Sequence, residues 1–221
     1  MRGLIHELES VFMNGHSYLE VICGPMFSGK TEELIRRMRR VAYARMRAIV
    51  FKPAIDVRYS DDLVVSHSEQ KIASIPVANV DKARAYLASV PVPFQVVGLD
   101  EIHLLDGEIV KLCEDLVSSG VRVIAAGLCE DYLGRPFGAV PELLAHADVV
   151  TKLWAVCMRC GSPASKSQRI CRPGEELKEE QVVVGAGLLY EARCRSCHVK
   201  AVVSLTPEQA FADADLVRAH V

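Results

Sequence analysis

The sequence predicts an α/β fold, with a parallel sheet covered by helices on both faces and a small zinc-binding domain after it. Three observations support this prediction. Short apolar segments alternate with segments of helical spacing, as in parallel sheets that are buried on both sides. Residues 24–31 fit the phosphate-binding pattern G-x-x-x-x-G-K-[ST], between an apolar segment and a helical one. Two C-x-x-C pairs follow at residues 157–160 and 194–197.

The expected strands are runs of apolar residues, and the expected helices carry apolar residues three or four positions apart. The first strand ends at the phosphate-binding pattern, the second before Pro53, and the fourth at Asp100 and Glu101. A polar loop at residues 55–62 precedes the third strand. Strands are expected at residues 19–23, 47–52, 71–77, 94–99 and 121–126, and helices at residues 31–44, 80–89 and 107–119.

A chain of 221 residues suits one α/β domain with a small appendage. We expect a nucleotide-binding domain at residues 18–150 and a zinc-binding domain at residues 151–204. Residues 1–17 are expected to form an N-terminal extension with one apolar helical stripe. Residues 205–221 are expected to form a C-terminal helical tail, in which Thr206 is the cap and a proline takes the first helical position.

Charge and hydropathy exclude several function classes. The net charge is −2 and the isoelectric point is near 6.4, so the sequence lacks the basic footprint of a nucleic-acid-binding protein. Apolar runs stay shorter than the roughly 20 residues that span a bilayer, and the N-terminus does not resemble a secretory signal. We therefore expect a cytoplasmic protein without a membrane or nucleic-acid partner.

The phosphate-binding pattern has a clear chemical meaning. Its two glycines let the loop wind closely enough for backbone N–H groups to point at phosphate oxygens. A lysine then adds positive charge at the terminal phosphates, and a threonine hydroxyl can bind Mg²⁺. The alternative is a glycine-rich turn without a ligand, but the flanking strand and helix favour binding of a nucleoside triphosphate. The residues concerned are Gly24, Pro25, Met26, Phe27, Ser28, Gly29, Lys30 and Thr31.

Asp100 and Glu101 end an apolar strand in a chain with a phosphate-binding loop. A carboxylate at that place is suited to Mg²⁺, usually through water. Two adjacent acids predict that Asp100 serves the metal and Glu101 acts as a general base. The alternative is the solvated beginning of a loop.

The spacing of four cysteines predicts a structural zinc site. Cys157, Cys160, Cys194 and Cys197 form two pairs that can each present two thiolates to one tetrahedral ion. Redox chemistry or disulfides are the alternatives, but neither pair opens a helix after a strand and no export signal is present. His198 is a possible substitute ligand. The remaining cysteines have no partner at ligand spacing, and three of them are expected to be core thiols: Cys23, Cys113 and Cys129.

Taken together, these residues resemble the small, zinc-containing class of thymidine kinases found in bacteria and in animal cytosol. The resemblance covers roughly residues 18–200 and rests on the order and spacing of several motifs. It implies phosphoryl transfer from ATP to the 5′-hydroxyl of thymidine or deoxyuridine for DNA-precursor salvage. It also implies a RecA-like core, a homotetramer and feedback inhibition by thymidine triphosphate. The motifs lie at residues 24–31 (GPMFSGKT), 52–60 (KPAIDVRYS), 100–103 (DEIH), 127–138 (GLCEDYLGRPFG), 155–169 (AVCMRCGSPASKSQR) and 185–198 (GAGLLYEARCRSCH).

The resemblance also implies roles for single residues. Lys30, Arg58 and Glu101 are the implied catalytic residues, and Arg58 offsets charge on the transferring phosphoryl group. Ile102 and His103 complete the ATP-binding motif. A segment anchored by zinc, the lasso (residues 181–190), covers the nucleoside. Its backbone N–H and C=O groups recognise the base. For the aromatic residues Tyr132 and Phe137, the alternative is core packing. For Arg58, the alternative is an ordinary position in a loop. The implied nucleoside contacts are Met26, Leu128, Tyr132, Phe137, Gln181, Val182, Val183, Val184, Gly185 and Tyr190.

The chain departs from the family pattern at positions that bear on turnover. His103 and Leu104 replace a glutamine and an aromatic residue, and Cys129 stands where aspartate is common. In the lasso, Ala186 interrupts the usual glycine pair, and two leucines (Leu188, Leu189) replace polar residues. These changes concern the lasso geometry and leave the phosphate site and the cysteine pairs intact.

Two other functions are consistent with parts of the sequence. A zinc-containing ATPase that acts on nucleic acid requires a basic face, which the acidic isoelectric point disfavours. A catalytically weakened relative would bind thymidine and ATP without turnover, which the intact Lys30, Thr31, Asp100 and Glu101 disfavour.

Overall fold

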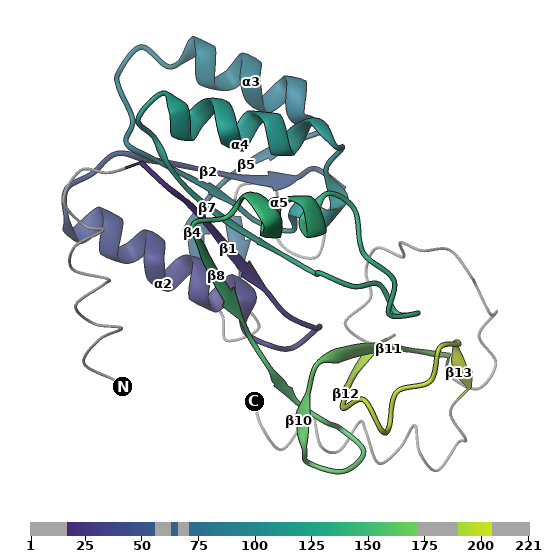
Figure 1. Cartoon of the computed structure of the whole chain (residues 1–221). Coiled ribbons are helices and arrows are strands. Elements are labelled where there is room, and N and C mark those ends of the chain that lie inside the picture. Colours follow the sequence, from purple (N-terminus) through teal and green to yellow (C-terminus); the bar gives the residue numbers. More distant parts are fainter. Residues whose placement is uncertain (1–16, 56–62, 66–70, 172–189, 205–221) are drawn as a thin grey trace.

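The computed structural model describes residues 17–55, 63–65, 71–171 and 190–204 (Figure 1). Several expected features lie outside these residues: the N-terminal and C-terminal helices, Arg58, and the lasso residues Gln181, Val182, Val183, Val184, Gly185, Ala186, Leu188 and Leu189.

Six parallel strands form the central sheet, in the order β5-β2-β6-β7-β1-β8. Cys23, the last residue of β1, lies opposite Gly127, the last residue of β7. The carboxyl ends of the central strands therefore meet at one edge, where ligands bind in open α/β sheets. The strands are β1 (Leu19–Cys23), β2 (Ala48–Pro53), β5 (Ile75–Val77), β6 (Val96–Leu99), β7 (Arg122–Gly127) and β8 (Val149–Lys152).

Helices cover both faces of the sheet, as the sequence predicts. Helix α2 (Lys30–Tyr43) packs on one face, and α3 (Val80–Ser89), α4 (Glu108–Ser118) and α5 (Val140–His146) lie on the other (Figure 1). Successive residues of a strand point to opposite faces, so Val21 joins the core under α3 to α5 while Ile22 joins the core under α2. Among the described helices, none is long and apolar enough to cross a membrane.

The structure differs from the sequence prediction in several elements. The single strand expected at residues 71–77 is two strands, because β4 (Lys71–Ala73) pairs with β3 (Leu63–Val65) and β5 joins the central sheet. Other elements were not expected, among them the 3₁₀-helix η1 (Ile102–Leu104), helix α5 and strand β8. The domain boundary expected near residue 150 falls inside β8, which pairs with β1 as far as Lys152.

A second region follows the sheet, and we call residues 155–171 and 190–204 the cysteine lobe. Its apolar cluster is small, consisting of Ala155, Cys157, Ala164 and Ala192 with two further cysteines packed against it. Polar contacts supplement this cluster, since the buried Glu191 carboxylate accepts hydrogen bonds from Arg159 and Arg193. Its strands are β9 (Ala155–Val156), β10 (Pro163–Ala164), β11 (Lys166–Cys171), β12 (Tyr190–Arg193) and β13 (Val203–Ser204).

A buried ionic cluster fixes α2 against the sheet. The Glu20 carboxylate of β1 contacts Arg37 of α2 and Arg122 of β7, each at 2.5 Å. Arg37 also donates a hydrogen bond of 2.8 Å to Thr151 in β8. The cluster thereby joins one helix and three strands, and it limits how far α2 can shift along the sheet.

Candidate active site

The phosphate-binding loop connects β1 to α2, and two glycines determine its path. Gly29 has a left-handed backbone with φ of 79°, which glycine adopts without the steric penalty of a Cβ. A Cβ on Gly24 would lie 2.8 Å from the carbonyl oxygen of Leu153, closer than real contacts allow. The loop therefore approaches the chain after β8 closely and then enters α2 at Lys30.

Contacts inside the loop hold its polar side chains. The Lys30 ammonium group and the Ser28 hydroxyl each donate a hydrogen bond of 2.8 Å to the carbonyl oxygen of Pro25. Both side chains are buried. Because Lys30 opens α2, its charge lies at the helix N-terminus, where backbone N–H groups also favour an anion.

Thr31 and Asp100, both expected at a magnesium site, lie close together at the edge of the sheet. The Thr31 hydroxyl lies 3.2 Å from one Asp100 carboxylate oxygen and 3.4 Å from the other. Asp100 follows β6 and is buried, and its Oδ1 atom accepts the backbone N–H of Glu101 at 3.0 Å. A hydroxyl and a carboxylate are the hard oxygen ligands that Mg²⁺ prefers.

Glu101 and His103 form the next part of the site. Glu101 is buried and has a left-handed backbone, with φ of 48° and ψ of 41°, before η1 begins. Its carboxylate oxygen lies 3.5 Å from Nδ1 of His103. The same nitrogen lies 3.2 Å from the backbone N–H of Leu128, so His103 links Glu101 to the segment after β7. Ile102 between them is fully buried in the core.

The two aromatic residues expected at the nucleoside are both buried. Phe137 contacts the His103 ring, with 4.7 Å between ring centroids, and Tyr132 lies under the Arg169 guanidinium at 5.4 Å. Asp131 holds the loop between them, since its carboxylate accepts the backbone N–H groups of Leu133 and Arg135. This arrangement is compatible with a base pocket and with core packing.

The cysteine lobe contacts the phosphate-binding loop directly, through a residue that the sequence reasoning missed. The backbone N–H of Met26 donates a hydrogen bond of 2.9 Å to the Ser167 hydroxyl in β11. The two residues are 141 positions apart, so no local pattern could have predicted the contact.

Further contacts join the cysteine lobe to the aromatic loop. Lys166 pairs with Glu130, and His198 Nε2 lies 2.8 Å from the carbonyl oxygen of Tyr132. Tyr190 lies opposite Arg169 in the β11–β12 ladder. Tyr190 is half-buried, and burial raises the pKa of its hydroxyl. The lobe therefore borders the same edge of the sheet as the phosphate-binding loop.

A groove of about 520 Å³ extends the phosphate site along α2. Ser28 and Gly29 form one end, and the arginine-rich side of α2 forms a wall. Arg36 of this wall pairs with Glu33 one turn earlier. The groove thus carries side chains of both charges beside the loop expected to bind phosphates. Its full lining is Ser28, Gly29, Glu32, Glu33, Arg36, Arg39, Arg40, Tyr43 and Leu153.

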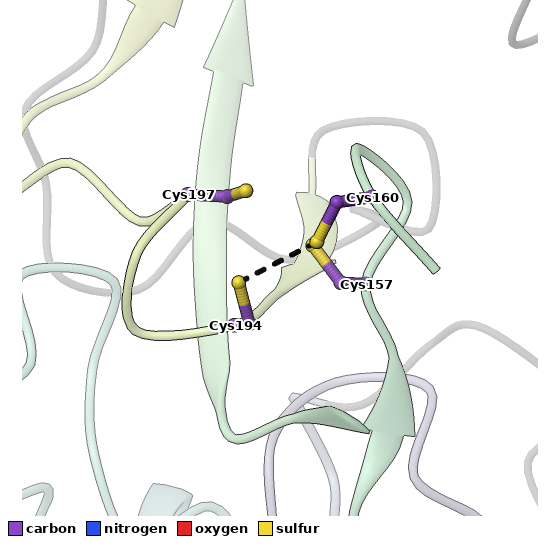
Figure 2. A group of neighbouring side chains, drawn as sticks. All are labelled: Cys157, Cys160, Cys194 and Cys197. Atoms are coloured by element: carbon purple, nitrogen blue, oxygen red, sulfur yellow. Dashed lines mark hydrogen bonds between the residues drawn. The ribbon is translucent and has the colours of Figure 1, made fainter. Parts of the chain in front are cut away.

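The four predicted cysteines converge from two turns of the lobe, with their sulfur atoms directed toward one another (Figure 2). All four sulfurs lie within 4.8 Å of one another, and those of Cys160 and Cys194 are 3.7 Å apart. Tetrahedral zinc with bonds of about 2.3 Å requires sulfur separations of about 3.8 Å, so the cluster could hold such an ion. His198 is not part of this cluster, because its ring contacts the Tyr132 carbonyl oxygen.

Comparison with known protein families agrees with this geometry. Residues 17–198 match the family described as thymidine kinase. The match covers most of the 221 residues and includes the phosphate-binding loop, the two acids and all four cysteines. The cysteine cluster is consistent with the small, zinc-containing type. The chain belongs to the thymidine kinase family and is an enzyme that phosphorylates thymidine.

Proposed function

We propose that the enzyme transfers the γ-phosphate of ATP to the 5′-hydroxyl of thymidine or deoxyuridine and supplies monophosphates for DNA synthesis. One observation carries the proposal: Thr31 of the phosphate-binding loop meets Asp100, and Glu101 follows immediately. A hydroxyl that meets a carboxylate, with a second carboxylate beside it, supports Mg²⁺ binding and general-base chemistry at one edge of the sheet. Phosphoryl transfer needs phosphate positioning, charge neutralisation and an oriented nucleophile.

The phosphates are held by the loop from Gly24 to Thr31 and by the N-terminus of α2. Lys30, which now donates to the Pro25 carbonyl, exchanges this acceptor for a phosphate oxygen when ATP binds. Thr31 and Asp100 hold Mg²⁺, which neutralises negative charge on the phosphates. Arg58 offsets further charge on the transferring group; this role rests on the family resemblance, since Arg58 lies outside the described residues.

Glu101 accepts the proton of the 5′-hydroxyl. Its side chain is buried beside Asp100 and His103, so the nucleoside must enter the edge of the sheet to reach it. His103 Nδ1 accepts the Leu128 backbone N–H and lies 3.5 Å from the Glu101 carboxylate, so the general base lies beside the segment after β7. Ile102 shapes the turn that presents Glu101.

The nucleoside lies between the sheet edge and the cysteine lobe. Met26, Leu128, Tyr132, Phe137 and Tyr190 supply the apolar surface around the base and sugar, and the lasso residues 181–185 read the base with backbone groups. A thymine or uracil edge offers an N–H between two carbonyls. Cytosine presents an amino donor in place of one carbonyl, which leaves buried groups unpaired at about 1–3 kcal/mol each.

The cysteine cluster binds one structural zinc ion. Four thiolates complete a tetrahedral shell and leave no position for water or substrate, so the ion supplies stability to the lobe instead of chemistry. The enzyme also forms a homotetramer and is inhibited by thymidine triphosphate. Both features rest on the family resemblance, and size-exclusion chromatography and inhibition assays test them.

Labelled ATP tests the reaction and its selectivity together. Purified enzyme is incubated with [γ-³²P]ATP, Mg²⁺ and each of the four deoxynucleosides or deoxyuridine, and the products are separated by thin-layer chromatography. We expect labelled monophosphates from thymidine and deoxyuridine only. A comparable kcat/KM for deoxycytidine would contradict backbone reading of the base. Hydrolysis of ATP without nucleoside labelling, stimulated by DNA or RNA, would contradict the proposed reaction.

A further inference from the structure

Tyr132 is contacted by two residues of the cysteine lobe, one at its ring and one at its backbone. The guanidinium carbon of Arg169 lies 5.4 Å from the centre of the Tyr132 ring. Nε2 of His198 lies 2.8 Å from the Tyr132 carbonyl oxygen, and this nitrogen carries the proton because a carbonyl oxygen only accepts hydrogen bonds. Tyr132 lies between β7 and α5, so both contacts join the lobe to the segment that follows a central strand.

Arg169 is a buried cation whose neighbours are tyrosines. It lies in β11 and is only 3% exposed. The negative face of an aromatic ring attracts a guanidinium, and the attraction is stronger in a buried site than at an exposed one. Tyr190, also proposed to contact the nucleoside, lies directly opposite Arg169 in the β11–β12 ladder, where facing side chains are close neighbours. Arg169 therefore lies beside two of the tyrosines proposed for the nucleoside pocket.

The turn that carries Tyr132 is fixed by bonds that act on its backbone. The Asp131 carboxylate accepts the backbone N–H groups of Leu133 and Arg135, each at 2.9 Å. These bonds determine the path of the turn, but they do not contact the Tyr132 ring. The orientation of the ring therefore depends on the groups packed against it, and Arg169 is one of them.

The position of His198 depends on the cysteine turn beside it. His198 follows Cys197 directly, and its backbone N–H donates a hydrogen bond of 3.0 Å to the carbonyl oxygen of Cys194. Its imidazole then contacts the Tyr132 carbonyl oxygen. The two contacts of the lobe thus differ in kind: the hydrogen bond restrains the backbone of Tyr132, and the guanidinium restrains its ring.

We propose that Arg169 and His198 are positioning residues for Tyr132 and that they thereby determine the affinity of the enzyme for thymidine. The inference rests on the proposed nucleoside pocket, in which Tyr132 packs against the base. An aromatic ring that is already oriented loses less conformational freedom when the nucleoside binds, so affinity rises. Both residues act through Tyr132, so their effect belongs to thymidine binding and leaves the chemical step nearly unchanged.

Calorimetric titration of the full-length enzyme with thymidine measures this effect directly. We expect Arg169→Gln to raise the Kd for thymidine about tenfold, and Arg169→Lys, which keeps a positive charge over the ring, to recover most of the loss. His198→Ala should raise the same Kd about fivefold, and His198→Gln, which keeps a side-chain N–H donor, should raise it less. The Kd for ATP and the kcat for thymidine should stay within about twofold in these variants.

Combined variants separate positioning from a general loss of structure. Tyr132→Leu lacks the ring, so adding Arg169→Gln should not weaken thymidine binding further, whereas independent contributions would add. Arg195→Gln is the matched control, because it removes an exposed arginine from the same lobe and should leave the Kd for thymidine unchanged. Circular dichroism and metal analysis identify variants that lose the fold. If Arg169→Gln is among them, the His198 variants provide the test.

The outcomes distinguish this inference from the proposed pocket on which it rests. An unchanged Kd for thymidine in Tyr132→Leu would place Tyr132 outside the pocket and overturn both. Weaker binding in Tyr132→Leu, with normal binding in Arg169→Gln and His198→Ala, would leave the pocket intact and overturn the positioning role. Additive losses in the double variant, or an equal loss of ATP affinity in Arg169→Gln, would overturn the positioning role as well.

Discussion

The phosphate-binding loop and the cysteine lobe are held in shape by different interactions. In the loop, the path follows from Gly24, the left-handed Gly29 and the beginning of α2, all within eight consecutive residues. The cysteine lobe has a small apolar cluster, and its cysteines come from segments more than 30 residues apart. Contacts with the rest of the chain, such as Ser167 to Met26, also join distant residues. We infer that the phosphate side of the site is preformed by local sequence, whereas the nucleoside side depends on long-range contacts and on metal.

Glu101→Gln is expected to have the largest effect, and it tests the sheet edge that both regions share. The amide keeps the size of the side chain but cannot accept the substrate proton at neutral pH. Loss of a general base lowers kcat by about 10²–10⁴, while ATP affinity should change little, because Thr31 and Asp100 are intact. Steady-state kinetics and ATP titration measure the two quantities. Glu108→Gln, at an exposed position in α4, is the control; near-normal turnover of Glu101→Gln would reject Glu101 as the base.

Removal of the metal separates the two regions most directly. Cys160→Ser or Cys194→Ser should lose zinc and loosen the lobe, raising the KM for thymidine by about tenfold or more, equivalent to about 1.4 kcal/mol. ATP affinity should stay within about twofold, because the phosphate-binding loop does not need the metal for its shape. Metal analysis and ligand titrations provide the readouts. Cys171→Ala, in β11 of the same lobe but outside the four-cysteine cluster, should retain zinc. An equal loss of ATP affinity would refute the independence of the two regions.

Ser167→Ala should have the smallest effect, because it removes one contact between the regions. The Met26 backbone N–H loses its acceptor, and one hydrogen bond contributes about 1 kcal/mol, or roughly fivefold in KM or kcat/KM. Ser167→Thr keeps the hydroxyl and should restore most of the activity, which a purely steric role would not explain. Unchanged kinetics in Ser167→Ala would mean that the lobe positions the loop through other contacts, such as Lys166 with Glu130.

Local patterns predicted the elements whose determinants are consecutive in the sequence. Strand β1 and helix α3 have the predicted bounds, and Asn79 caps α3, since its side chain accepts the Lys82 backbone N–H. Strand β8 was missed because its pattern is weak at the edge of the sheet, where Val150 is exposed and charged Lys152 follows. Helix α5 was missed because it has only seven residues and carries proline in its first turn.

The site was predictable to the extent that its parts are motifs. Motif spacing identified the residues that meet in two places. Thr31 contacts Asp100, and the four cysteines converge. The contact of Ser167 with Met26 depends on which segments become neighbours in the fold. A buried Glu20 with two arginine partners likewise requires knowledge of the β1–β7 register.

The left-handed backbone of Glu101 sets thermal stability against the proposed general base at one position. A residue with a Cβ pays roughly 1 kcal/mol or more to adopt this conformation, whereas glycine adopts it freely. Selection for resistance to heat alone would therefore favour glycine at position 101 and would remove the carboxylate. Glu101 adopts this backbone nevertheless, so the surrounding fold stabilises a conformation which the residue itself disfavours. Gains in stability for this enzyme are therefore better sought away from the turn after β6.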